Sequence, residues 1–66
     1  MKNNLKVQRA IANMTQAELA EKIGVSRQTI NAIEAGKFVP STVLALKLAK
    51  LFERSVNEIF ELEAAD

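Results

Sequence analysis

The sequence predicts an all-α fold, a single domain built from five short helices. Only two glycines and one proline occur in 66 residues, and apolar residues recur at three- and four-residue spacings, which is typical of helices joined by short turns. Two segments also have the pattern of a capping box, in which a hydroxyl and a carboxylate satisfy the free N–H groups at a helix start. A chain of this length has room for one domain, so residues 1–66 are expected to fold as one.

The first helix is predicted from about Asn4 to Asn13. Leu5, Arg9 and Ala12, together with Ile11 and Met14, mark this helix. Asn13 can adopt the left-handed backbone conformation that ends a helix, a position more often occupied by glycine. The chain should therefore turn sharply at Asn13.

The second helix is predicted to begin at the capping box Thr15-Gln16-Ala17-Glu18. It should end at about Ile23, because Gly24 follows and glycine turns the chain through positive φ at the least steric cost. The apolar stripe of this helix consists of Leu19, Ala20 and Ile23.

The third helix is predicted to have Ser26 as its N-cap and to be ended by Gly36. Ile30 and Ile33 are its inward positions. The residues left for its other faces are Arg27, Gln28, Thr29, Asn31 and Ala32.

The fourth helix is predicted from the cap at Ser41 to about Phe52, after an extended connection over Lys37-Phe38-Val39-Pro40. Its apolar residues cover more of the helix surface than one core-facing stripe requires, while Lys47 and Lys50 mark the solvated side. Part of this helix is therefore expected to face another subunit. The apolar positions are Val43, Leu44, Ala45, Leu46, Leu48, Ala49, Leu51 and Phe52.

A second capping box, Ser55-Val56-Asn57-Glu58, predicts a fifth helix of one or two turns. The segment that follows, Phe60-Glu61-Leu62-Glu63, alternates apolar and acidic residues as a half-exposed strand does. Its only plausible pairing partner is the N-terminal segment Met1 to Asn3, so a small terminal β-ribbon is expected.

Composition excludes several classes of site. The chain has no cysteine and no histidine, which removes disulfides, Cys/His zinc sites, thiol nucleophiles and imidazole bases. No acid/base pair, phosphate-binding glycine loop or metal cluster stands out, so we expect neither an enzyme nor a cofactor or metal. No stretch approaches the roughly 18 apolar residues of a membrane span and no signal peptide is visible, so a cytoplasmic location is expected.

Charge is unevenly distributed, although the net charge is only +1. Residues 1–52 carry eight basic and three acidic side chains, a net charge of +5, whereas residues 53–66 carry Arg54 and five acidic side chains, a net charge of −4. A polyanion would be attracted to the first part and repelled by the tail, which should point away from it. A solvated acidic terminus would have the same composition.

Residues 16–35 predict two short helices that cross steeply about a tight turn. Ala20 is small where the two helices approach, Gly24 supplies the turn, and Val25, Ile30 and Ile33 fasten the third helix to the core. The opposite face of the third helix is thereby left free.

At this point the sequence resembles the phage-repressor and Cro-like helix-turn-helix family. The resemblance rests on residues 15–20, 24–30 and 33–37 and extends over roughly Leu5 to Phe60, with Pro40-Ser41 and residues 55–60 also similar. It implies a five-helix domain that binds operator DNA as a homodimer, with the third helix in the major groove. We would then expect a transcriptional repressor whose half-sites are about 34 Å apart.

The resemblance also implies roles for individual residues. Gln16 matches a position that meets a phosphate through its side chain and backbone while it steadies the recognition helix, and Lys37 matches a phosphate-binding position in the loop. Arg9 and Glu34 match a structural ion pair between the first and third helices. The full set of expected DNA-binding residues is Gln16, Ser26, Arg27, Gln28, Thr29, Asn31 and Lys37.

Side-chain chemistry suits these roles, since arginine pairs with guanine, glutamine and asparagine pair with adenine, and threonine can meet a phosphate or a thymine methyl. An ordinary polar helix face has the same residue types. The competing hypothesis is a protein-interaction module, such as an antitoxin or adaptor, that uses the apolar fourth helix and the Phe60–Leu62 end to bind a different protein.

Overall fold

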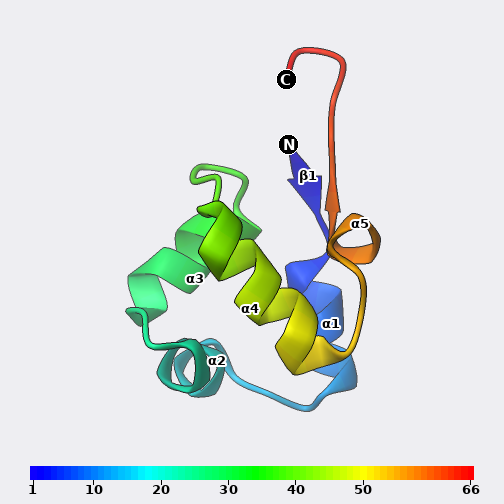
Figure 1. The fold of residues 1–66 in the computed structure, drawn as a ribbon. Helices are drawn as coiled ribbons and strands as arrows, with labels where there is room; N and C mark the ends of the chain where they lie inside the picture. Colours follow the sequence, from blue (N-terminus) through cyan, green and yellow to red (C-terminus); the bar gives the residue numbers. More distant parts are fainter.

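The computed structural model describes all 66 residues and has the five helices that the sequence predicts, together with a short terminal sheet (Figure 1). None of the helices is long and apolar enough to cross a membrane. In chain order the elements are β1 (Lys2–Asn3), α1 (Leu5–Ile11), α2 (Gln16–Ile23), α3 (Arg27–Glu34), α4 (Thr42–Phe52), α5 (Val56–Ile59) and β2 (Phe60–Glu61).

The helix starts are set by local capping. The Thr15 hydroxyl accepts a hydrogen bond from the Glu18 N–H at 3.1 Å, and the Glu18 carboxylate accepts one from the Thr15 N–H at 3.0 Å. Ser26 caps α3 in the same way, through the Thr29 N–H at 3.2 Å. At the start of α5 the Glu58 carboxylate accepts from the Ser55 N–H at 3.0 Å. Each bond satisfies an N–H that the helix cannot pair internally.

The helix ends are less regular than their starts. Asn13 has φ 55° and Gly24 has φ 74°, the left-handed conformation expected at both turns. Helix α1 nevertheless ends at Ile11, two residues before the predicted end. Helix α4 ends at Phe52, as predicted, and Glu53 after it has φ 54°, although it is neither glycine nor asparagine. A left-handed glutamate carries a steric cost, and this turn pairs the Glu53 and Arg54 N–H groups with the Lys50 and Ala49 carbonyl oxygens at 3.2 and 3.0 Å.

One hydrophobic core joins all five helices and the start of β2. It contains 11 buried apolar residues, and the largest that are fully buried are Leu5, Leu19, Ile30, Ile33 and Leu48. Ala20 is also buried, and Val25 packs against the core from the turn between α2 and α3. Helices α2 and α3 are thus fixed to each other and to the core behind them.

The apolar surface of α4 is divided between two faces. Leu44, Leu48 and Ala49 are buried, whereas Val43 is 64% and Leu46 is 55% exposed. A single exposed aliphatic side chain on a helix is normal. A group of neighbouring exposed aliphatic side chains marks an interaction surface.

The terminal ribbon is present and antiparallel, with Lys2 opposite Glu61 and Asn3 opposite Phe60. Figure 1 shows β1 and β2 side by side at one end of the molecule, with both termini there and α2 at the other end. Phe60 closes the core, whereas Leu62 is 77% exposed. Of these two residues, only Leu62 is largely exposed to a partner.

Candidate nucleic-acid interface

Helix α3 presents a polar face to solvent and an apolar face to the core. Arg27, Gln28 and Asn31 are exposed, and Ile30 and Ile33 are completely buried. At roughly 100° per residue, the three polar side chains lie within an arc of about 100°. They therefore share one face of the helix, which is distinct from the face of the residues that anchor it.

Ser26 and Thr29 lie at the N-terminal end of α3 and are partly used by the helix itself. Their hydroxyl oxygens are 2.9 Å apart and hydrogen bonded, while Ser26 also accepts the Thr29 N–H. Ser26 is exposed and Thr29 is half-buried. Both are positioned beside the polar face, with less freedom than the residues on it.

Lys37 lies just beyond the opposite end of α3. Gly36 has φ 74°, and the Lys37 N–H donates to the Ala32 carbonyl at 2.9 Å, which fixes where the loop leaves the helix. The Lys37 side chain is exposed. Helix α3 is about 12 Å long at the 1.5 Å rise per residue of a helix, so this cation lies at the far end of α3 from Ser26.

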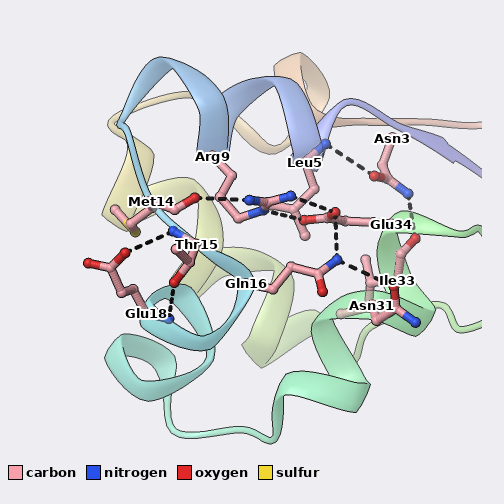
Figure 2. Close-up of polar contacts among 10 residues, drawn as sticks. All are labelled: Asn3, Leu5, Arg9, Met14, Thr15, Gln16, Glu18, Asn31, Ile33 and Glu34. Carbon is pink, nitrogen blue, oxygen red and sulfur yellow. Dashed lines mark hydrogen bonds and ion pairs between the residues drawn. The ribbon is translucent and has the colours of Figure 1, made fainter.

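Gln16, the first residue of α2, is brought onto the side of α3. Its amide nitrogen Nε2 donates to Asn31 Oδ1 at 3.3 Å and to Glu34 Oε1 at 3.1 Å (Figure 2). The structure thereby joins Gln16 to Asn31, which are 15 residues apart, in one polar group.

Behind this face, Arg9 and Glu34 form an ion pair with two hydrogen bonds. Arg9 Nε lies 2.8 Å from Glu34 Oε2, and Arg9 Nη2 lies 3.1 Å from Glu34 Oε1. Arg9 Nη1 also donates to the Met14 carbonyl at 2.9 Å. The guanidinium therefore ties α1 and the α1–α2 turn to the last turn of α3 (Figure 2).

The Glu34 carboxylate is held in its ionised form. Burial alone would raise its pKa, but hydrogen bonds from Arg9 and Gln16 and the positive charge of Arg9 outweigh burial and lower the pKa. The pKa of Arg9 is raised in turn, chiefly by its hydrogen bonds to Glu34. The pair is charged throughout the neutral range.

Sequence reasoning missed Asn3, which supports α3 from the ribbon side. Asn3 Nδ2 donates to the Ile33 carbonyl at 2.8 Å, and Asn3 Oδ1 accepts from the Leu5 N–H at 3.1 Å. Both contacts appear in Figure 2. The side chain links β1, α1 and the end of α3, and no local pattern signals such a long-range contact.

Comparison with known proteins places this geometry in a family. A helix-turn-helix family model matches residues 5–59. An HTH-type transcriptional regulator of Methanocaldococcus jannaschii is 57% identical over 63 residues, 96% of each chain. The cryptic phage CTXphi transcriptional repressor RstR of Vibrio cholerae is 33% identical over this whole chain and 59% of its own length.

A solved structure has the same fold. The SOS-response transcriptional repressor LexA of Eubacterium rectale superposes with a TM-score of 0.81 and 32% identity, over 96% of this chain and 67% of that one. The family match covers nearly all of the residues that build α1 to α5. The chain therefore belongs to the helix-turn-helix family and is an HTH-type transcriptional regulator.

Proposed function

We propose that this regulator is a sequence-specific double-stranded DNA-binding repressor that binds a palindromic operator as a homodimer. The observation that carries the proposal is the division of α3, which exposes Arg27, Gln28 and Asn31 while Ile30 and Ile33 are fully buried. A helix that is anchored in this way can present its exposed face to the major groove while its buried residues stay packed in the core.

The exposed side chains have the chemistry that base reading requires. Arginine donates two hydrogen bonds to guanine O6 and N7, and an amide can contact the edge of a purine. Lys37 supplies a cation for a backbone phosphate beyond one end of α3, and the first turn of α2 directs backbone N–H groups outward at Gln16. Ser26 and Thr29 add hydroxyls beside the groove-facing residues.

The charge distribution favours the same orientation. The net charge of +5 belongs to residues 1–52, which include α2, α3 and Lys37. The acidic tail extends from the ribbon end of the molecule, away from α2 (Figure 1). Residues 16–37 carry three basic and three acidic side chains, so a duplex that approaches α2 and α3 avoids the net charge of −4 of the tail.

The homodimer is supported by an apolar face formed by α4, its preceding loop and the ribbon. Val39, Val43 and Leu46 are all more than half exposed, and so is Leu62 beyond β2. A shallow depression beside Leu46 is lined mainly by apolar side chains, among them Val39, Pro40, Ala45, Val56 and Phe60. A small domain has a thin core, and pairing of this face in a second copy would bury more apolar area.

A repressor role is supported by two similar proteins whose names describe them as transcriptional repressors, RstR and LexA. A dimer would place two α3 helices in major grooves about 34 Å apart on one face of the duplex. A repeated, inverted half-site follows from the two-fold symmetry of such a dimer.

Gel-shift titration of the full chain against a random duplex pool tests the proposal. We expect two chains per bound duplex, competition by the selected sequence but not by a scrambled one, and a steep loss of affinity between about 50 and 200 mM salt. Equal affinity for every duplex would refute sequence-specific binding. A protein that remains monomeric and pairs only with a different protein would instead support an interaction module.

A further inference from the structure

We propose that Asn31 reads its base pair only as a hydrogen-bond donor, because Gln16 and Glu34 turn its amide oxygen away from the groove. Asn31 should then select guanine, which has two acceptors, over adenine, the base expected from residue type alone. The inference rests on the proposed DNA-binding function and concerns the orientation of one side chain within it.

The first step is the direction of the Gln16 amide. An ionised carboxylate can only accept hydrogen bonds, and Arg9 holds Glu34 in this form through contacts of 2.8 and 3.1 Å. The Gln16 atom that lies 3.1 Å from Glu34 Oε1 must therefore be its donor, Nε2. The opposite orientation would place the Gln16 oxygen against a carboxylate oxygen.

The second step is the orientation of the Asn31 amide, which follows from that of the Gln16 amide. An amide nitrogen carries two hydrogens, and Gln16 Nε2 uses one for Glu34 and directs the other to Asn31 at 3.3 Å. The Asn31 atom that receives it must be an acceptor, Oδ1. Figure 2 shows the resulting chain from Arg9 through Glu34 and Gln16 to Asn31.

The third step concerns what Asn31 offers to a base. Its oxygen is directed at α2, so its nitrogen Nδ2 is directed away from α2, on the exposed face of α3. A paired contact with adenine needs the oxygen and the nitrogen to face the same base edge. An amide held with its oxygen toward Gln16 presents only the N–H groups of Nδ2 instead, which can donate to guanine O6 or N7, both of them acceptors.

The two hydrogen bonds donated by Gln16 Nε2 also change the role expected of the Gln16 side chain. Both donors of its side chain are engaged within the protein, so a phosphate contact at this position is left to the backbone N–H at the start of α2. The Gln16 side chain is therefore a positioning group for Asn31.

The test begins with binding-site selection by the full-length wild type and by Asn31→Ala. The base pair whose preference disappears in Asn31→Ala is the one that Asn31 reads. We expect guanine there, favoured over adenine by roughly tenfold. Replacing this guanine by 7-deazaguanine, which lacks the N7 acceptor, should weaken binding by the wild type and leave Asn31→Ala unaffected.

Gln16→Met then removes the directing donor while it keeps side-chain length and helix propensity. We expect the guanine preference at this base pair to fall to threefold or less, with preferences at the other pairs retained. Gln28→Ala is the matched control, since it removes an exposed amide from the same face and should alter only a different base pair.

Four outcomes contradict the inference. Adenine at the Asn31 base pair, an unchanged guanine preference in Gln16→Met, or an equal effect of Gln28→Ala at that pair overturns it while sequence-specific binding stands. Absence of any sequence-specific binding by the wild type overturns the proposed function and this inference together.

Discussion

Arg9 and Glu34 join the first and third helices through one guanidinium and one carboxylate, with N–O distances of 2.8 and 3.1 Å. Their side chains are only 16% and 7% exposed. A third hydrogen bond from Arg9 reaches the Met14 carbonyl at 2.9 Å. The orientation of α3 relative to α1 thus depends on a nearly buried ion pair as well as on the apolar core.

Arg9→Ala should destabilise the domain by about 3 kcal/mol. It leaves the buried Glu34 carboxylate without its counter-charge and the Met14 carbonyl without the hydrogen bond that Arg9 donates. A 66-residue domain has a total stability of roughly 3 to 10 kcal/mol, so the variant should be close to unfolding. Urea unfolding followed by circular dichroism measures the change. Lys47→Ala, an exposed cation on α4, is the control and should change stability by less than about 0.5 kcal/mol. Equal effects of the two variants would show that the ion pair is dispensable.

Acid should weaken the fold partly through Glu34. Its pKa is lowered in the folded protein from a usual value of 4.5, so the stability that it contributes is fully present above pH 4.5 and is lost as the pH falls through the folded pKa. We expect the free energy of unfolding of the wild type to fall more steeply below pH 4.5 than that of Glu34→Gln. Other carboxylates with lowered pKa values, such as Glu18, are common to both proteins and cancel in the difference. Parallel curves would contradict this role for Glu34.

Lys37→Ala should weaken binding to the selected duplex and to unrelated duplexes by a similar factor. Loss of one phosphate contact should also reduce the slope of log affinity against log salt by about 1. Fluorescence anisotropy at several salt concentrations measures both. Lys50→Ala removes the same charge from an exposed position on α4 and should leave the slope unchanged. A loss confined to the selected sequence would assign Lys37 to base reading instead.

Leu46→Glu should convert the proposed homodimer into monomers, because it places a charge in the proposed apolar face of α4. Sedimentation equilibrium of the wild type and the variant measures the change in dimer affinity, expected to be tenfold or more for a central interface position. Val7→Glu is a matched control, since Val7 is 54% exposed and Leu46 is 55% exposed, but Val7 lies on α1. A dimer that survives Leu46→Glu and dissociates with Val7→Glu would move the interface to α1.

Local chemistry explains which parts of the fold could be predicted. Caps such as Thr15 and Ser26 act on N–H groups within three residues, so their sequence signatures predict the helix starts directly. The end of α4 at Phe52 agrees with the prediction, but the left-handed conformation of Glu53 was not predictable, because no glycine or asparagine marks that position. The terminal ribbon followed from the alternation at residues 60–63 and is confirmed.

The polar face of α3 was predictable from Ile30 and Ile33, whose spacing fixes the buried side of the helix. Of the contacts that orient this face, the family resemblance implied the Arg9–Glu34 ion pair and a steadying role for Gln16, but not the individual partners of Asn3 and Gln16. Asn3 reaches Ile33 across 30 residues and Gln16 reaches Asn31 across 15, and such pairs depend on the tertiary arrangement of α1, α2 and β1. Neither contact can be predicted from the spacing of residues in the sequence.

The most direct test of DNA reading by α3 is binding-site selection with the wild type and Arg27→Ala, an exposed residue of the proposed face. We expect the wild type to select an inverted repeat, and Arg27→Ala to lose the preference for one guanine in each half-site while it keeps the others. An identical selected sequence for both proteins, or no selected sequence for the wild type, would contradict the account.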